Sequence, residues 1–360
     1  MSAPLHTAAD TAWFADNAEA YDLGTADADR LVPELGRRGL FRIGVPQALG
    51  GAGGGIYDGV EAIAAIAEAS LTAAFVFWGQ RTFIEYLLQS PNAALRERWL
   101  PALLAGEFAG ATGLSNAMKF LSGIESLQIG ARPQDGGWRL DGRLPWVTNL
   151  RKAGFIAAAA VARADTDAPM VVAITGDHAG ITRSADLDLV ALRGSNTAAI
   201  DIQGADVGPE HVLHEDARRF CPALRPAFLA LQLGMSIGLA RIALRTAAAQ
   251  GQGTHRILLP RVAEASAELE GLAASLRDGL AGRRFEADPA ALFRIRLRLA
   301  EIVQTALGLE LDASGGRAYL RDHGRGFARR WVEGAFIPVI TPSLTQLQGE
   351  LDRHAAAGTA

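Results

Sequence analysis

Arg81 stands in an apolar stretch with helical spacing, where residues 78–82 read WGQRT. A guanidinium is costly to bury unless it meets an anion or several hydrogen-bond acceptors. Two kinds of partner suit it. An anionic ligand group, such as a carboxylate, a sulfinate or a thioester oxygen, would make Arg81 a ligand-binding or catalytic residue. Glu85 on the next helical turn, or solvent at a helix end, would make it structural.

Two other features could carry chemistry, and each favours a simple interpretation. Cys221 is the only cysteine, which excludes an intrachain disulfide and a cysteine-based metal site and fits a reducing cytoplasm. Residues 50–55 read GGAGGG, a run that could cradle a phosphate. No strand pattern precedes this run and no Gly-Lys-Ser/Thr follows it, so we interpret it as a loop between two helices.

The composition excludes two classes of protein. With 49% hydrophobic and 21% charged residues and a formal net charge of -4, the chain suits a folded globular protein and offers no broad basic surface for nucleic acid. The first residues lack the basic start and apolar run of a secretory signal, and the longest uncharged apolar stretch, 226–240, is too short to cross a bilayer. We therefore expect a cytoplasmic protein that binds a small molecule, without a metal, a nucleic acid or a membrane partner.

The hydrophobic pattern changes twice along the chain. Residues 27–109 show helical spacing, residues 112–213 show short runs with a period of two, and residues 224–351 return to helical spacing. Helices, then strands, then helices indicate an α+β fold of two or three domains around a shared ligand site. We place a helical domain at 1–111, a β domain at 112–222 and a second helical domain at 223–360.

Several segments, taken in order, resemble acyl-CoA dehydrogenases. Residues 35–40 read LGRRGL and are followed by Val45-Pro46, which is similar to the first helix and the VPEEYGG turn of that family. Other segments match the family's KERYLP, YVLNGTKxWITN and LRGSDT: LRERWLP at 95–101, WRLDG at 138–142, WVTN at 146–149 and LRGSNT at 192–197. The resemblance covers nearly the whole chain. It implies a helical domain, a central β-barrel and a C-terminal four-helix bundle, with a flavin held between the last two.

An isoalloxazine ring needs an aromatic or apolar face and a few hydrogen bonds to its nitrogens and oxygens. By resemblance, Trp146 packs beside the ring and Thr148 bonds near N5, the atom that accepts hydride; the alternative for Trp146 is an ordinary core position. Leu114 and Ser115 stand where the family contacts the flavin edge. Ser122 is the nearest match to the serine that meets the pyrophosphate, with an ordinary loop serine as its alternative.

The family holds the second half of FAD with a neighbouring subunit, through an RxxFG segment and a glycine pair. Here residues 254–260 read THRILLP, so Arg256 is displaced and the phenylalanine is missing. Gly315 and Gly316 keep the pair that lets backbone approach a phosphate, and Gln348 falls where the family keeps a glutamine. The resemblance implies FAD in a homodimer or homotetramer. The departures leave open FMN or a partner chain that completes the site.

The resemblance also points to a missing base. Removing the α proton of an acyl thioester requires a positioned carboxylate, which the family supplies as the glutamate of a YEGT loop. Counting back from Gln348 places Pro342 there, and proline has neither a titratable group nor an N–H. Residues 224–238, where some relatives carry the glutamate instead, contain no carboxylate. Glu333 and Glu350 flank the loop, and we interpret both as members of solvated helix faces.

Several functions stay open. The leading hypothesis is a flavin-dependent oxidoreductase that acts on an acyl thioester or a related small substrate without the usual base. A second is a non-catalytic or half-site subunit that completes a heteromer with a base-bearing paralogue. A flavin monooxygenase or oxidase, a desulfinase-like lyase in which Arg81 holds the anion, and a scaffold without flavin are further alternatives. Arg225 and His255 are weaker polar candidates, because helix ends often carry such residues.

Overall fold

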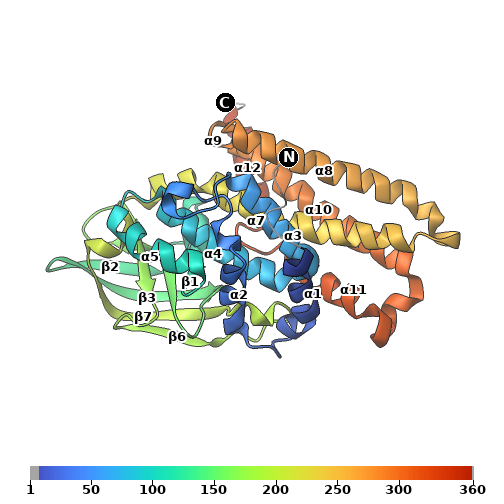
Figure 1. Ribbon diagram of the computed structural model, residues 1–360. Coiled ribbons are helices and arrows are strands. Elements are labelled where there is room, and N and C mark those ends of the chain that lie inside the picture. Colours follow the sequence, from blue (N-terminus) through green and yellow to red (C-terminus); the bar gives the residue numbers. More distant parts are fainter. Residues whose placement is uncertain (1–7, 359–360) are drawn as a thin grey trace.

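The computed structural model describes residues 8–358, and its elements follow the predicted order of helices, strands and helices. In Figure 1 part of the N-terminal helical region lies above a β-sheet and part lies beside it, and a long helical bundle extends away from both. This arrangement confirms the predicted α+β fold with a helical region on either side of a β region in the sequence.

The N-terminal region is built around one buried helix, α4. Ser70 caps α4 by accepting a hydrogen bond from the N–H of Ala73, and the helix is buried from Leu71 to Leu87. The predicted loop at 50–55 is confirmed, with Gly50, Gly53 and Gly54 in the left-handed region. The elements are α1 (Ala8–Asp22), η1 (Ala28–Arg30), α2 (Leu31–Arg37), η2 (Leu40–Arg42), η3 (Gln47–Leu49), α3 (Ile56–Ala69), α4 (Leu71–Gln89) and α5 (Ala93–Ala105).

The β region forms a mixed eight-stranded sheet. Its elements are β1 (Ala109–Thr112), α6 (Ser115–Leu121), β2 (Ile129–Gln134), β3 (Gly137–Val147), β4 (Phe155–Arg163), β5 (Met170–Thr175), β6 (Ile181–Asp186), η4 (Arg193–Ser195), β7 (Ala198–Val207), η5 (Pro209–His211) and β8 (Val212–His214). Among the described residues, hydrogen bonds join the strands in the open order β6-β7-β3-β2-β4-β5-β8, and β1 pairs with β4. The predicted strand at 170–175 has the observed bounds of β5. The first strand begins at Ala109, slightly before the boundary expected at 112.

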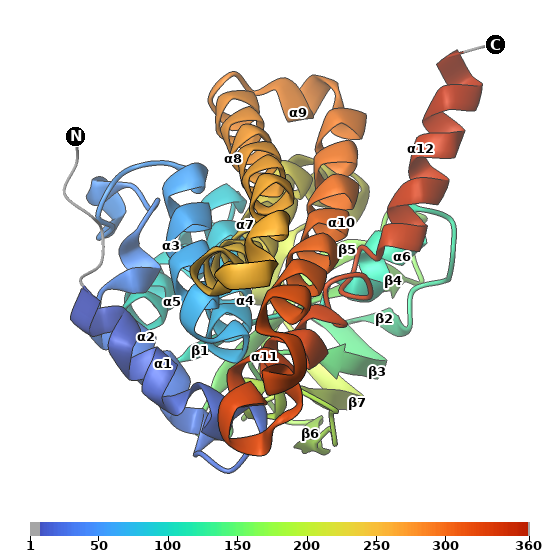
Figure 2. The ribbon, with the colours of Figure 1, turned by 90° about the vertical axis from the view of Figure 1, so that its right-hand side faces the viewer.

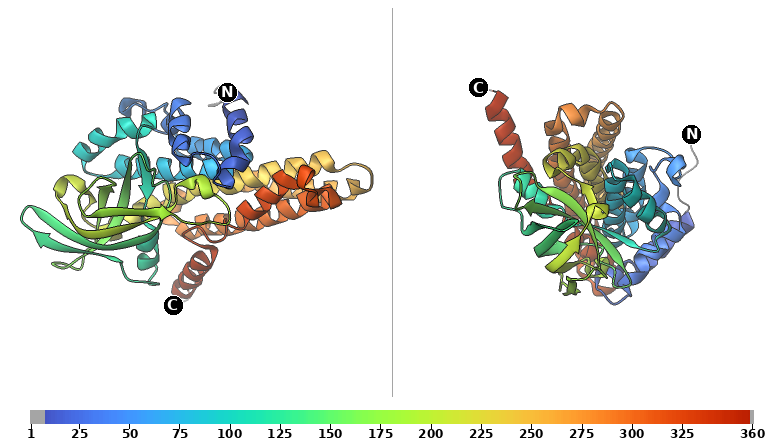
Figure 3. Two further views of the ribbon diagram at one scale, coloured as in Figure 1. Left: turned by 90° about the horizontal axis from the view of Figure 1, so that it is seen from below. Right: turned by 90° about the vertical axis from the view of Figure 1, so that its left-hand side faces the viewer.

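The C-terminal region is a bundle around two long helices, α7 and α10, which pack against each other. Figure 2 shows this bundle end-on, with α12 projecting from it on the far side of α10 from α8. Figure 3 shows how far the bundle extends beyond the sheet. The elements are α7 (Ala217–Gln250), η6 (Gly253–Leu258), α8 (Leu259–Ala281), α9 (Arg284–Ala287), α10 (Pro289–Ser314), η7 (Gly315–Tyr319), α11 (Arg321–Gly334) and α12 (Leu344–Gly358).

The start of α7 differs from the sequence prediction. Its spacing indicates a helix from about residue 224, but α7 begins at Ala217 and continues through Pro222 and Pro226. Asp216 caps this end by accepting hydrogen bonds from the N–H groups of Arg218 and Arg219. The prolines interrupt the helical pattern in the sequence, while the cap and the packing of α7 on its neighbours hold the backbone helical.

Close approach of two helices ties the N-terminal region to the bundle. A Cβ added at Gly238 of α7 would lie 2.1 Å from the carbonyl oxygen of Ala64, and one at Gly234 would lie 2.6 Å from that of Val60, both on α3. Glycine is therefore required for α3 and α7 to pack at this distance. By length and composition α7 alone among the described helices could span a bilayer, but 89% of its most apolar window is buried in the protein, as in the core helix of a soluble protein.

Candidate functional site

A bulge at the end of β3 exposes the indole of Trp146. In the antiparallel pairing of β3 and β7, the register shifts between Leu144 and Val147, so an extra residue is inserted there. Trp146 is 61% exposed, whereas its neighbour Val147 is fully buried. The interpretation of Trp146 as an ordinary core residue is wrong, because the bulge turns its side chain outward.

Thr148 follows this bulge and belongs to a buried group of hydroxyls. Its Oγ1 lies 3.1 Å from Oγ1 of Thr197, which in turn lies 2.8 Å from Oγ of Ser195. All three side chains are buried. The sequence pointed to Thr148 alone, although Ser195 and Thr197 belong to the LRGSNT segment that carried the resemblance.

Asn149 fixes the end of β3 in place. Its Nδ2 donates to Oε1 of Gln80 on α4 (3.0 Å) and to the carbonyl oxygen of Gly110 on β1 (2.9 Å), and its N–H donates to the carbonyl oxygen of Ser195 (3.0 Å). Its φ of 67° lies in the left-handed region, which asparagine tolerates. Sequence reasoning missed this anchoring role of Gln80 and Asn149; the one available signal was the asparagine that ends the WVTN motif.

Leu114 and Ser115 lie at the start of α6, which packs against the sheet. Leu114 is buried and Ser115 is half-buried. Immediately before them, a Cβ added at Gly113 would meet the carbonyl oxygen of Ala158 at 2.3 Å and the side chain of Leu144 at 2.8 Å. The absence of a side chain at Gly113 therefore lets this segment approach the backbone of β4 at Ala158 and the side chain of Leu144 on β3.

Ser122 lies at the other end of α6 and contacts α12. Its hydroxyl lies 2.6 Å from Oε1 of Glu350 and accepts a hydrogen bond of 2.8 Å from Nε2 of Gln346. Gln348 is exposed and donates to Asp352 (3.0 Å), so Gln346 is the glutamine of this helix that turns toward α6. The sequence missed Gln346, because the segment TQLQ offers two glutamines and only packing shows which faces inward.

Glu333 and Glu350 are both buried, so their interpretation as solvated helix faces is wrong. Oε2 of Glu350 accepts a hydrogen bond of 3.0 Å from Arg225 on α7, and its side chain is closed in by α6, α7 and α12. Glu333 is 1% exposed, its Oε1 has no partner, and its Oε2 lies 3.7 Å from Nε of Arg329. Burial raises the pKa of Glu333 to about 7, although Arg329 opposes the shift.

Two buried polar side chains, one on α7 and one on α10, hold the loop that carries Pro342. Nε2 of Gln232 donates to the carbonyl oxygen of Thr341 (3.0 Å), and Nε of Arg296 donates to Oε1 of Gln232 (3.1 Å). Arg296 also donates from Nη2 to the carbonyl oxygen of Ile337 (2.6 Å), and burial lowers its pKa to about 10. Pro342 itself is buried. The side chains that hold this loop are thus a guanidinium and an amide.

Arg81 is fully buried and has protein partners. Its Nη1 donates to Oε2 of Glu85 (2.9 Å), its Nε to the carbonyl oxygen of Ile43 (3.2 Å) and its Nη2 to that of Gly44 (2.8 Å). The pairing with Glu85 is one of the two alternatives that the sequence left open. In this structure Arg81 joins α4 to the loop that follows η2.

Arg256, Gly315 and Gly316 lie together at the far end of the bundle. Arg256 is exposed in η6, and a Cβ added at Gly315 would lie 3.6 Å from the ring of His255. In Figure 1 the connections that carry them, between α7 and α8 and between α10 and α11, lie at the end of the bundle away from the sheet. Within a single chain, these residues are therefore separated from Trp146 and Thr148 by the length of the bundle.

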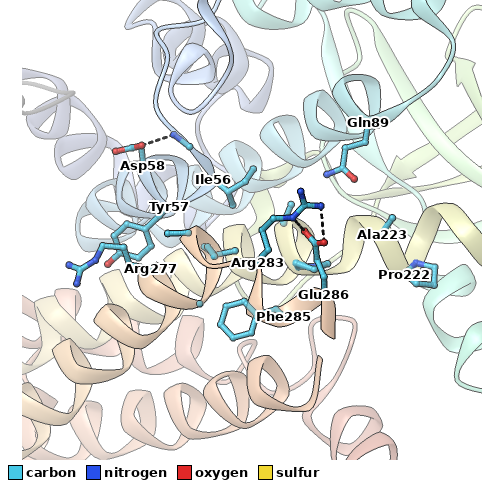
Figure 4. A pocket seen from close by; sticks show the side chains of 16 residues that line it. Ile56, Tyr57, Asp58, Gln89, Pro222, Ala223, Arg277, Arg283, Phe285 and Glu286 are labelled. Atoms are coloured by element: carbon cyan, nitrogen blue, oxygen red, sulfur yellow. Dashed lines mark hydrogen bonds and ion pairs between the residues drawn. The ribbon is translucent and has the colours of Figure 1, made fainter. Parts of the chain in front are cut away.

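A cleft of about 800 Å³ lies beside the first turns of α7 (Figure 4). Its walls come from the start of α3, the end of α4 and the α8–α9 connection, with Tyr57, Gln89, Pro222 and Arg277 among the lining residues. Arg283 faces it but is paired with Glu286 through two contacts of 2.9 Å. The described lining includes none of the residues that the sequence assigned to the site. Among the side chains that the structure describes, no group of three or more His, Cys, Asp or Glu residues could hold a metal ion.

A helical region, a mixed sheet and a second helical bundle define the acyl-CoA dehydrogenase fold. Residues 7–107 match the N-terminal domain of acyl-CoA dehydrogenases as a family. The chain is 29% identical over 193 residues to mitochondrial isovaleryl-CoA dehydrogenase from Pongo abelii, a match that covers 51% of this chain and 44% of that protein. These matches support membership of the acyl-CoA dehydrogenase superfamily. The aligned region spans less than half of that relative's length.

Two solved structures show the same fold over the whole chain. Butyryl-CoA dehydrogenase from Megasphaera elsdenii superposes with a TM-score of 0.82 at 17% identity and covers 98% of this chain and 96% of its own. KijD3, in complex with FMN and a dTDP-linked amino sugar, superposes with a TM-score of 0.81 at 22% identity and covers 97% and 92%. At these identities the likeness concerns the fold alone.

Proposed function

We propose that the chain is a flavin-binding oxidoreductase that acts on an acyl thioester or a related small substrate without the usual glutamate base, with FAD as its cofactor. The observation that supports it most is the exposed indole of Trp146 close to the buried hydroxyl of Thr148 at the end of β3. An exposed aromatic face and a fixed hydroxyl are what an isoalloxazine requires, so these residues fit the ring. A bound flavin would supply the hydride acceptor.

The dinucleotide half of FAD fits less well within one chain. The hydroxyl of Ser122 is bound to the carboxylate of Glu350, and a carboxylate repels a pyrophosphate. Arg256, Gly315 and Gly316 lie at the far end of the bundle, so they could contact a cofactor at Trp146 only from a second chain. FAD therefore requires an oligomer here. FMN, which lacks the adenylate half, is the alternative that needs none.

The surroundings of Pro342 support the absence of the usual base. A general base must be a titratable group within hydrogen-bond reach of the proton that it removes. The described side chains that hold the loop are Gln232 and Arg296, and neither can accept a proton at neutral pH. Glu350 is turned toward Arg225 and Ser122. A substrate that loses hydride without loss of a carbon-bound proton suits this chemistry better than a simple acyl thioester does.

Flavin binding by the purified chain tests the proposal. We expect a yellow protein with flavin absorbance, and we expect Trp146→Ala to bind the flavin about tenfold more weakly through the loss of an aromatic contact. Trp331→Ala, at another exposed tryptophan on α11, is the matched control and should bind normally. A folded protein that stays colourless when supplied with FAD or FMN would contradict the proposal.

A half-site subunit of a heteromer is the second candidate. The buried Pro342 and the displaced Arg256 favour it, because the first removes the base and the second removes a contact to the partner's cofactor. The flavin content per chain, measured together with the mass in solution, separates the two candidates. Full loading in a homo-oligomer supports an independent flavoprotein, whereas loading only after addition of a base-bearing relative supports the half-site.

A further inference from the structure

Arg296 on α10 carries a buried positive charge without a counter-charge. Its side chain is 1% exposed, and among the described residues no Asp or Glu lies within ion-pair distance of its guanidinium. Burial lowers the pKa of Arg296 to about 10, so the group stays protonated at neutral pH. Arg81, which is buried to the same extent, differs because it is paired with Glu85. A cation that the fold leaves uncompensated calls for an anion from elsewhere.

Part of the hydrogen-bonding capacity of Arg296 and of its neighbour Gln232 is unused. Arg296 donates from Nε to Oε1 of Gln232 (3.1 Å) and from Nη2 to the carbonyl oxygen of Ile337 (2.6 Å), whereas its buried Nη1 has no partner in residues 8–358. Nε2 of Gln232 carries two hydrogens, and the structure describes one acceptor for them, the carbonyl oxygen of Thr341. Two adjacent buried side chains therefore keep donors free.

A structural role alone does not account for the charge of Arg296. The groups that it and Gln232 hold are the carbonyl oxygens of Ile337 and Thr341, and a neutral N–H donor satisfies a carbonyl oxygen. Gln232 does this with an amide, which costs less to bury than a guanidinium. The positive charge and the unused donors at Nη1 are both unfavourable unless an acceptor with negative charge completes them.

The loop at residues 335–343, which connects α11 to α12, separates this pair from solvent. Val339 in the middle of the loop is 63% exposed, while Ile337 and Ile340 are buried against the bundle. The hydrogen bonds that tie the loop to Gln232 and Arg296 run through two backbone carbonyl groups. An anionic group can therefore reach the free donors when the loop shifts, and no helix of the bundle has to move.

We propose that Arg296 and Gln232 form a binding site for the carboxylate of a small acidic ligand, which the loop at 335–343 admits by shifting. A carboxylate presents two oxygens in one plane, and Nη1 of Arg296 together with the remaining N–H of Gln232 offers donors to both. The inference rests on the proposed function, because it takes the loop of Pro342 as the place where the substrate reacts. It narrows the substrate to one that carries a carboxylate.

The test compares acids with neutral molecules of the same shape. Butyrate and butyramide form one pair of probes and benzoate and benzamide a second, and titration calorimetry with the flavin-loaded protein measures the affinity of each at constant ionic strength. We expect at least one carboxylate to bind about tenfold or more tightly than its amide, because a hydrogen bond to a buried guanidinium is stronger when the acceptor is charged. The visible spectrum of the flavin is recorded in parallel.

Three variants identify the charge as the cause. Arg296→Gln removes the charge but keeps an amide donor and should abolish the preference for the carboxylate, whereas Arg296→Lys keeps the charge and should retain part of it. Gln232→Glu gives Arg296 a counter-charge within the protein, so it should also abolish the preference. Arg294→Met, at an exposed arginine of the same helix, is the matched control and should leave the preference unchanged. A loosened loop weakens the binding of acid and amide alike, so the ratio of the two affinities reports the charge.

The failures of the two proposals are distinguishable. If the protein binds flavin but prefers neither carboxylate, or if the preference survives in Arg296→Gln, the anion site is wrong and the proposed flavoprotein stands. If the chain binds no flavin but still prefers a carboxylate in a manner that depends on Arg296, the anion site stands and the proposed function is wrong. Gln232→Glu and Arg296→Lys decide the matter should Arg296→Gln fail to fold.

Discussion

The guanidinium of Arg225 lies 3.0 Å from the carboxylate of Glu350, and this ion pair joins the beginning of α7 to α12. The same carboxylate receives the hydroxyl of Ser122 at 2.6 Å, which extends the connection to α6. Three elements that are remote in sequence are thereby fixed at one carboxylate. An acidic side chain on α12, the helix that follows the loop of Pro342, is thus engaged in structure rather than exposed to a ligand.

Replacing Glu350 by Gln should destabilise the protein by about 2 kcal/mol. The change leaves a largely buried Arg225 without its counter-charge, and the effect is reduced from that of a fully buried pair because the arginine side chain is 16% exposed. Urea unfolding measures the loss. Gln348→Ala on the exposed face of the same helix should change stability by less than about 0.5 kcal/mol. Normal stability with abolished turnover would instead identify Glu350 as the missing base.

Replacing Pro342 by Glu should supply the missing general base. If Pro342 occupies the position of the family's base, a carboxylate there should accelerate flavin reduction by a short acyl-CoA about 10²–10⁴-fold. Anaerobic stopped-flow bleaching of the flavin measures this rate. Pro342→Gln, which has similar size but no base, should show no gain. Equal rates of flavin reduction for the Glu and Gln variants, both with flavin bound, would show that position 342 does not correspond to the position of the family's base.

Glu333 should make stability depend on pH. Burial raises its pKa to about 7 from an ordinary value of 4.5, so the folded state favours the protonated form. A raised pKa contributes stability that is fully present below the unfolded value and is lost as the pH rises through the folded value. The charged groups that face Glu333 are Arg329, Arg330 and Asp22. Burial also raises the pKa of Asp22.

The Glu333→Gln variant isolates this effect. Relative to the unmodified chain, its unfolding free energy should increase by up to about 3 kcal/mol between pH 4.5 and pH 7, because glutamine has no proton to lose. Urea midpoints at a series of pH values measure the difference. Asp352→Asn, on the last helix and bound to Gln348, serves as a carboxylate control. A difference that does not vary with pH would contradict the assignment.

Replacing Arg81 should affect folding before it affects chemistry. Arg81→Ala removes a buried partner of Glu85 and two hydrogen bonds to the carbonyl oxygens of Ile43 and Gly44, so we expect a loss of about 3–5 kcal/mol. Arg81→Ala combined with Glu85→Ala should lose less than the sum of the single changes, because no buried charge is left over. Loss of turnover with an unchanged urea midpoint would instead identify Arg81 as a ligand-binding or catalytic residue.

The comparison of Trp146 with Gln346 shows where sequence reasoning reaches its limit at the site. Trp146 and Thr148 could be chosen because residue type and motif together indicate a ring-binding strand. Gln346 could not be separated from Gln348, since both stand in one short segment and only the docking of α12 on α6 decides which is buried. Glu350 and Glu333 were misjudged for the same reason, because helical spacing does not reveal a partner that comes from a distant helix.

The sequence by itself determined the order of helical, β and helical regions, the loop at 50–55, the bounds of β5 and the kinship with acyl-CoA dehydrogenases, since these follow from local pattern and ordered motifs. Tertiary structure alone decided that Arg81 pairs with Glu85, that Glu350 anchors α12 and that the hydroxyls of Ser195 and Thr197 continue from that of Thr148. It also decided that the connections α7–α8 and α10–α11, which carry Arg256 and Gly315, lie at the end of the bundle away from the sheet that carries Trp146. The physical reason is that burial and hydrogen bonding depend on which distant segments meet, and that is settled by the packing of the whole chain.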